Sequence, residues 1–248
     1  MFKQYLKQYL KFLAETKKLM LIFVLLFVAL QMFLYWLSPH IPIPKAIAED
    51  ILIFTALQNV FSSAVIMLLS VPITGLAVSV LLCENKYSGG YYFKKWYLPS
   101  LAYNIATGLI TFAGYYPLMH GKHDTWAAVW TFAVSLALVK FAIWMQIGMR
   151  EELSFKAALI SSWKRLSFWR SILIVICSII PGMLIPVCNF FLELAKAPLM
   201  PGLFVQNAVI GLTDYLIILI LILFYWKIIE DEKAKNMAGA GGPAVKII

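Results

Sequence analysis

The chain has 248 residues, of which 62% are hydrophobic and only 13% are charged, with a mean hydropathy of +0.84 and a net charge of +9. A soluble domain carries about 25% charged residues, so this composition excludes a water-soluble globular protein. In a soluble protein the basic excess would suggest nucleic-acid binding. Here the basic residues gather in one set of loops beside an anionic leaflet, and we predict no nucleic-acid partner.

The N-terminal segment, residues 2–18, has the pattern of a basic amphipathic helix. Apolar residues recur at helical spacing on one face, and lysines recur on another. The apolar face consists of Phe2, Leu6, Leu10 and Leu13, and the basic face of Lys3, Lys7 and Lys11. We expect this helix to lie in the headgroup region with its lysines facing anionic lipid.

Six apolar stretches long enough to cross a bilayer follow. They cover approximately residues 19–38, 52–83, 97–117, 126–149, 169–192 and 204–229. Pro72 predicts a tilt or kink in the second span, and Pro181-Gly182 with Pro186 predicts a bend in the fifth. We therefore predict an all-α integral membrane bundle with two basic amphipathic interfacial helices, built as one transmembrane domain (1–235) followed by a flexible tail (236–248).

The basic residues in the loops predict the orientation. Seventeen lie in the N-terminal segment, the loops after spans two and four, and the C-terminal region, whereas three lie in the other loops. By the positive-inside rule, both termini are expected on the cytoplasmic side of a bacterial inner membrane.

The stretch from Ser154 to Glu232 carries a family resemblance. It reads Phe155-Lys-Ala-Ala-Leu159, then Ser162-Trp163-Lys-Arg-Leu166, then Phe168-Trp169-Arg, and its last apolar span ends in Tyr225-Trp226-Lys227. This resembles the YciC-like group of bacterial multi-pass membrane proteins, which is similar to the membrane domain fused to some glycerophosphodiester phosphodiesterases. The resemblance implies a fold type and an envelope role, and it supplies no catalytic residues.

Two ionisable residues inside predicted spans are the sharpest candidate site. Lys140 and Asp214 are each about ten residues, or roughly 15 Å, from a span end, which places both near the bilayer midplane. A charge there is costly unless it has a partner. We therefore expect an ion pair between them, with snorkelling of Lys140 and a protonated or hydrogen-bonded Asp214 as the alternatives.

Polar and small residues form stripes along the second, third and sixth spans. These stripes include Asn59, Asn104, Thr111 and Asn207. They are typical of a close-packing seam between membrane helices, and the alternative is the lining of a polar cavity.

The three histidines, all in predicted outer loops, are weak candidates for a metal site together with one aspartate. These residues are His40, His120, His123 and Asp124. Solvated loop residues are the favoured interpretation, so we predict no metal, no cofactor and no catalytic group.

These observations favour a non-enzymatic membrane protein, an accessory or scaffold subunit in lipid handling or envelope maintenance, whose partners are membrane lipids and a protein in a membrane complex. The alternative is a small transporter or channel with a polar path around Lys140 and Asp214. An intramembrane enzyme is disfavoured because no interfacial catalytic cluster is visible.

Overall fold

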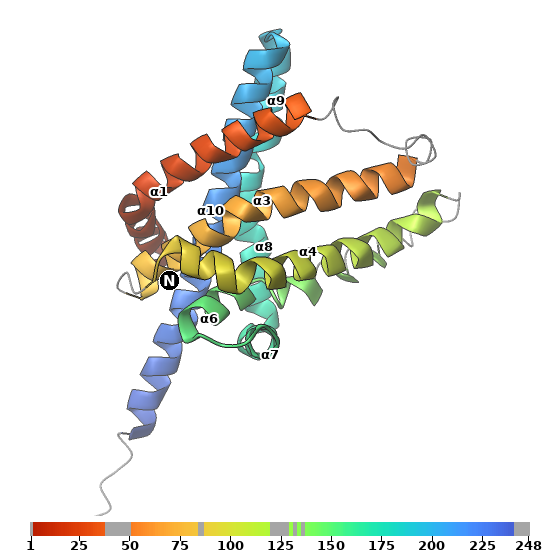
Figure 1. The fold of residues 1–248 in the computed structure, drawn as a ribbon. Helices are drawn as coiled ribbons and strands as arrows, with labels where there is room; N and C mark the ends of the chain where they lie inside the picture. Colours follow the sequence, from red (N-terminus) through yellow and green to blue (C-terminus); the bar gives the residue numbers. More distant parts are fainter. Residues whose placement is uncertain are drawn as a thin grey trace, which may run out of the picture.

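The computed structural model describes residues 2–37, 51–83, 87–119, 129–130, 133–134 and 137–240, and in these every regular element is a helix (Figure 1). In chain order they are α1 (Phe2–Leu37), α3 (Ile51–Leu82), α4 (Gly89–Met119), α6 (Trp144–Glu151), α7 (Phe155–Arg165), α8 (Phe168–Gly182), α9 (Leu184–Leu194) and α10 (Leu199–Ala240). Long apolar sequences form helices because lipid offers no hydrogen-bond partner to a free backbone group.

Within the described residues, four helical stretches are long and apolar enough to cross a membrane. They are Lys3–Leu37, Ala64–Leu82, Phe168–Leu194 and Leu199–Met237. The predicted all-helical membrane fold is therefore confirmed. The third predicted span, 97–117, lies within the longer helix α4, which already begins at Gly89.

The fifth predicted span is interrupted where the prolines predicted a bend. Helix α8 ends at Gly182 and α9 begins at Leu184, with Met183 between them. Pro181 and Pro186 have no backbone N–H, so each removes one hydrogen bond of a continuous helix. Helix α3, in contrast, continues through Pro72.

The N-terminal segment differs from its prediction, because residues 2–18 continue without a break into the first span as part of α1. Leu6 and Leu10 are 46% and 54% exposed, whereas Tyr5 and Phe12 contact Phe224 and Trp226 of α10 at ring-centroid distances of 6.0 and 6.1 Å. Tyr5 and Phe12, together with Leu13, therefore lie on the face that packs on the bundle, whereas Leu6 and Leu10 do not.

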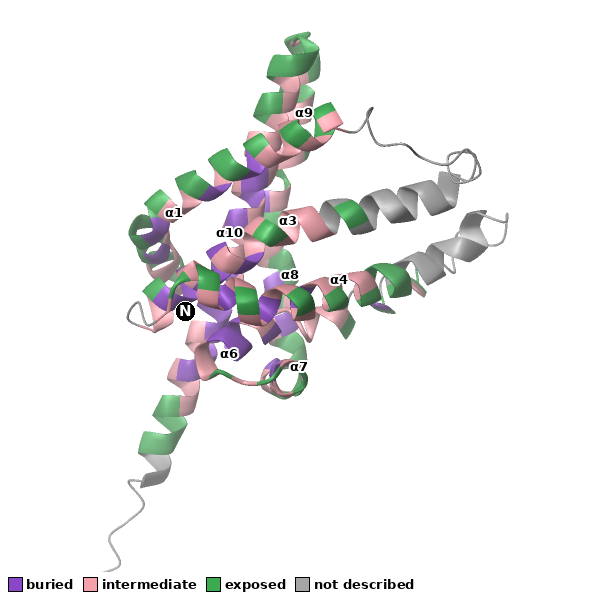
Figure 2. Cartoon of the chain, viewed as in Figure 1, coloured by how far each residue is buried: buried purple, intermediate pink, exposed green. Residues whose placement is uncertain are grey.

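The helices pack in antiparallel pairs around α10. Figure 1 shows α3 and α4 as a hairpin, and α8–α9 running beside α10, while α1 crosses the same helix. The largest core cluster joins α1, α3, α4, α6 and α10, and a second joins α6, α8 and α10. In Figure 2 the buried residues concentrate where these helices meet, and exposed residues dominate the free end of the α9–α10 hairpin.

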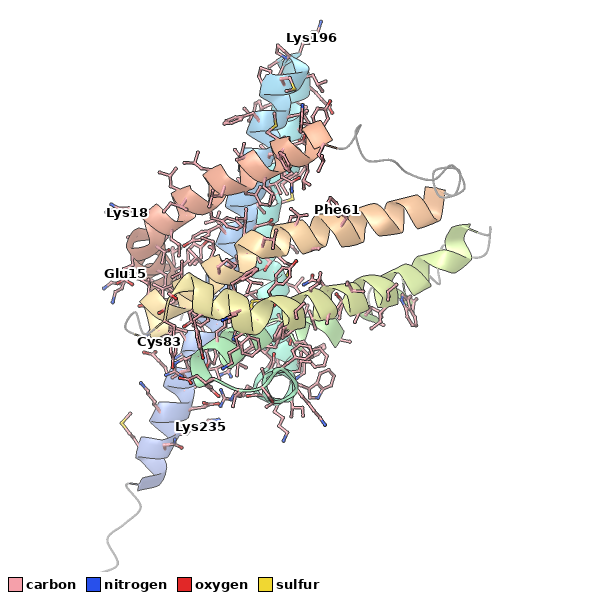
Figure 3. The ribbon with its side chains drawn as sticks, viewed as in Figure 1. Glu15, Lys18, Phe61, Cys83, Lys196 and Lys235 are labelled. Carbon is pink, nitrogen blue, oxygen red and sulfur yellow. The ribbon has the colours of Figure 1, made fainter. Side chains whose placement is uncertain are left out.

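Two residues labelled in Figure 3 mark the long axis of the molecule. Lys196, in the turn between α9 and α10, lies at one extremity, and Lys235, near the end of α10, lies towards the other. Helix α10 continues to Ala240, into the segment that was predicted as a flexible tail from residue 236. Residues 241–248 lie outside the described part of the chain.

Candidate functional site

Four helices meet at the end of the bundle that holds the N-terminus of α8, and they bring charged side chains together. We call this group the ionic cluster; its members are Glu151 of α6, Arg165 of α7, Arg170 of α8, and Tyr225, Lys227, Asp231 and Glu232 of α10. Four of the five ion pairs found in the described residues lie here. The cluster fixes α6, α7 and α8 to the last turns of α10.

Arg165 is the centre of the first half of the cluster. Its guanidinium donates to the Glu151 carboxylate, and its Nε lies 3.3 Å from Glu232 Oε1. The Tyr225 hydroxyl donates to the same Glu151 oxygen at 2.7 Å. Burial lowers the pKa of Arg165, but the hydrogen bond and charge of Glu151 and the charge of Glu232 outweigh burial and raise it. Arg165 is thus a permanent cation that binds α7 to α6 and α10.

Asp231 is the centre of the second half. It accepts from Arg170 Nη2 at 2.5 Å, and Lys227 Nζ approaches its other oxygen at 2.9 Å. Arg170 stands in the first turn of α8, which Ser167 caps by accepting the Arg170 backbone N–H at 3.3 Å. The ion pair between Arg170 and Asp231 therefore fixes the N-terminal end of α8 beside the last turns of α10.

Lys140 binds the C-terminal end of α7, next to Arg165. Its ammonium donates to the Leu166 carbonyl at the α7 C-cap and lies 5.2 Å from the centre of the Trp163 ring. In return, Ser162 Oγ donates to the Lys140 carbonyl at 3.0 Å. A cation at a helix C-terminus is stabilised by the free carbonyl groups there. Lys140 therefore has a structural partner.

The prediction that Lys140 lies near the bilayer midplane assumes an unbroken helix over residues 126–149. That span is not continuous where it is described, because residues 140–143 form a turn before α6 begins at Trp144. Leu166, the partner of Lys140, directly precedes the Ser167 cap of α8, so the ammonium lies beside the start of α8. The depth of Lys140 in a membrane stays a prediction.

Asp214 lies elsewhere, near the middle of the candidate span Leu199–Met237. In the described part of the chain its carboxylate forms no ion pair with Lys140, so the expected pair is not formed. Its neighbour Thr213 is buried and donates to the Pro181 carbonyl at 3.2 Å, next to the interruption between α8 and α9.

The polar stripe of α4 packs against α3. Asn104 Nδ2 donates to the Ser100 carbonyl at 2.9 Å and approaches Met67 Sδ of α3 at 3.5 Å. The Tyr97 hydroxyl donates to the Ala64 carbonyl, also of α3, at 3.3 Å. These contacts are those of a packing seam between membrane helices.

The structure gives less information about the other polar residues that the sequence singled out. Asn207 is partly buried on α10. The backbones of Asn59 and Thr111 are helical, within α3 and α4, but their side chains lie outside the described residues. The histidine group, His40, His120, His123 and Asp124, also lies outside them. The residues that are described include no group of three or more potential metal ligands.

Helix α7 buries one face and exposes another. Ala158 and Ser162 are fully buried, and the Ala158 Cβ lies 3.1 Å from where a Cβ on Gly148 of α6 would stand. The exposed stripe follows the spacing i, i+4, i+7, i+8 and consists of Lys156, Ile160, Trp163 and Lys164. Phe168 and Trp169, 56% and 73% exposed, extend it to the start of α8.

The sequence placed α7 correctly but missed the ionic cluster. In the sequence, Arg165 and Arg170 count only among the seventeen basic residues that indicate the orientation. The available signal was the presence of Glu151, Asp231 and Glu232 on the same predicted side of the membrane.

Lys140 gives a first prediction. Lys140→Met should lower the free energy of unfolding by about 1–2 kcal/mol, because it removes a charged hydrogen-bond donor and a cation–π contact. Thermal unfolding in detergent measures this loss, and Lys17→Met, at an exposed lysine of α1, should stay within about 0.5 kcal/mol. Equal stability of the two variants would show that the Leu166 contact contributes nothing.

Comparison with known proteins adds no assignment: no family model, no curated protein and no solved structure matches this chain.

Proposed function

We propose that this chain is a non-enzymatic, multi-pass protein of the bacterial inner membrane, an accessory or scaffold subunit in lipid handling or envelope maintenance. The observation that carries the proposal is the exposed stripe of α7. The ionic cluster and Lys140 hold this helix rigidly at the end of the α8 span, and its outward face combines apolar, aromatic and basic residues. Such a face suits the headgroup layer of a membrane.

The proposed topology has six spans with both termini in the cytoplasm. Segments predicted to share the cytoplasmic side do lie together: the Tyr87 hydroxyl donates to Glu152 Oε1 at 2.5 Å, and Tyr5 contacts Phe224. In addition to the four stretches named above, the proposal assigns spans to α4, which pairs with α3 along its length, and to residues 126–149. The YciC-like resemblance of residues 154–232 is consistent with this arrangement and stays part of the proposal.

The geometry gives less support to a transporter or channel around Lys140 and Asp214. The ammonium of Lys140 binds the α7 C-cap, and no ion pair joins it to Asp214 within the described residues. In favour of transport, the interruption between α8 and α9, beside Thr213, resembles the discontinuous helices that form substrate sites in transporters. Flux that Asp214→Asn abolishes in a folded protein would support transport.

The test is extraction of the native protein in lipid-preserving particles, followed by mass spectrometry of the lipids and proteins that co-purify. We expect a stoichiometric protein partner, enrichment of a lipid over the bulk membrane, or both. A particle that contains neither would overturn the proposal. Extraction of an unrelated multi-pass protein from the same membrane gives the bulk lipid composition for comparison.

A further inference from the structure

Resting on the proposed function, we propose that the exposed stripe of α7, with the start of α8, is a docking surface for the phosphate headgroups of anionic phospholipids. The inference names the lipid class that the scaffold holds. Four observations carry it: the free charge on the stripe, the exposed tryptophans beside it, a second basic stripe near the same turn of α10, and the rigidity of its support.

The free positive charge on this surface belongs to two lysines. Arg165 and Arg170 are neutralised by Glu151, Glu232 and Asp231. Lys156 and Lys164 are exposed, eight positions apart on one face of α7, and form no ion pair in the described part of the chain. Their ammonium groups are therefore free to bind an anion from outside the protein.

The neighbouring side chains fix the depth of the lysines. Beyond Trp169, the exposed residues of α8 are aliphatic, among them Leu173, Ile176 and Ile180 at 49%, 51% and 68%. Such a surface belongs to the hydrocarbon layer, whereas exposed tryptophan is typical of its boundary. Trp163 and Trp169 therefore place the two lysines at the level of lipid phosphates.

A second basic and apolar stripe lies at a similar level. On α1, Leu6 and Leu10 are exposed beside Lys3 and Lys7, and Tyr5 of the same segment contacts Phe224, one residue from the Tyr225 that binds Glu151. Two separate helices thus present lysines next to exposed apolar residues near the same turn of α10. This repetition fits an anionic layer around the bundle.

The support of the stripe is rigid, so binding orders little of the protein. Helix α7 is capped at its N-terminus by Ser154, which accepts the Ala157 N–H, and its C-terminal end is held by Arg165 and Lys140. A preformed face retains more of its interaction energy as affinity than a mobile one.

The experiment is native mass spectrometry of the delipidated protein in detergent, titrated with either phosphatidylglycerol or phosphatidylcholine. The full-length protein should bind phosphatidylglycerol about 25-fold more tightly, about fivefold for each of the two lysines. The Lys156→Gln/Lys164→Gln variant should lose about fivefold in phosphatidylglycerol affinity for each lysine, and its phosphatidylcholine binding should not change. Added salt should weaken only the anionic lipid.

The matched control is Lys196→Gln/Lys235→Gln, which removes two exposed lysines near the two extremities of the molecule (Figure 3). It should retain the wild-type preference, as should Lys156→Arg/Lys164→Arg, which keeps the charge and separates a folding defect from lost binding. Equal binding of the two lipids by the wild type would overturn the inference. So would equal losses of phosphatidylglycerol affinity in Lys156→Gln/Lys164→Gln and in Lys196→Gln/Lys235→Gln. If a partner or lipid co-purifies but the titration shows no preference for phosphatidylglycerol, the proposed function stands and this inference fails. If the extracted particle contains neither a partner nor an enriched lipid, the proposed function and this inference both fail.

Discussion

Replacing Gly75 by alanine should destabilise the bundle by more than about 3 kcal/mol, which exceeds the usual cost of overpacking. A Cβ at this position of α3 would stand 2.2 Å from Cγ and 2.5 Å from Cβ of Tyr92 on α4. The Tyr92 side chain is fully buried, and its Cβ is fixed by the backbone, so no change of rotamer relieves the 2.5 Å contact. The two helices must separate along the seam that also contains Asn104 and Met67.

Thermal unfolding in detergent measures this effect, and a midpoint roughly 6–12 °C lower is expected for a chain of this size. The matched control is Gly108→Ala, in the helix that contains Tyr92, because a Cβ at Gly108 meets nothing within 4 Å. That variant should be as stable as the wild type or slightly more stable, since alanine favours a helix by up to about 1 kcal/mol over glycine. Similar midpoints for both variants would mean that α3 and α4 do not approach as closely as described.

Arg165→Met should cost about 2–3 kcal/mol of stability and release α7. The variant keeps an apolar stem but leaves the Glu151 carboxylate with the Tyr225 hydroxyl as its remaining partner in the cluster, and it leaves Glu232 without its cation. Hydrogen bonds to charged groups contribute about 1.5–3 kcal/mol. The side chains of Arg165 and Glu151 are 26% and 24% exposed, so the loss stays below that of a fully buried pair.

Two measurements are needed for this variant. The thermal midpoint reports the stability, and limited trypsin digestion after Lys156 and Lys164 reports the release of α7, which should accelerate cleavage at both lysines. The control is Glu15→Gln, which breaks the exposed ion pair with Lys11, 3.8 Å long, and should cost less than about 0.5 kcal/mol. Unchanged cleavage in Arg165→Met would show that other contacts hold α7.

The ionic cluster also explains how a helix with an exposed tryptophan and isoleucine keeps a fixed position. Helix α7 is only 11 residues long, and isolated helices shorter than about 12–15 residues are marginal in water. Its contacts with Glu151, Lys140 and Gly148 supply the order that local propensity does not. The proposed lipid surface thus depends on ion pairs whose members are not part of that surface.

The sequence by itself determined the helical fold, stretches apolar enough to cross a membrane, an irregularity near Pro181-Gly182 and the presence of a second basic amphipathic helix, because apolar length, proline chemistry and helical periodicity act within a few residues. It did not determine which face of residues 2–18 packs on the bundle. Leucine and tyrosine both suit a buried face, and only the position of α10 decides between them.

The position of Lys140 and the ionic cluster were likewise decided by tertiary structure alone. The sequence places Lys140 on an unbroken helix, whereas in the structure it stands in the turn at residues 140–143 and contacts Leu166 from another part of the chain. Glu151 and Arg165 are close in the chain, but Tyr225, Asp231 and Glu232 join them from another helix. Such pairing depends on how helices are stacked in space, which periodicity within one helix does not encode.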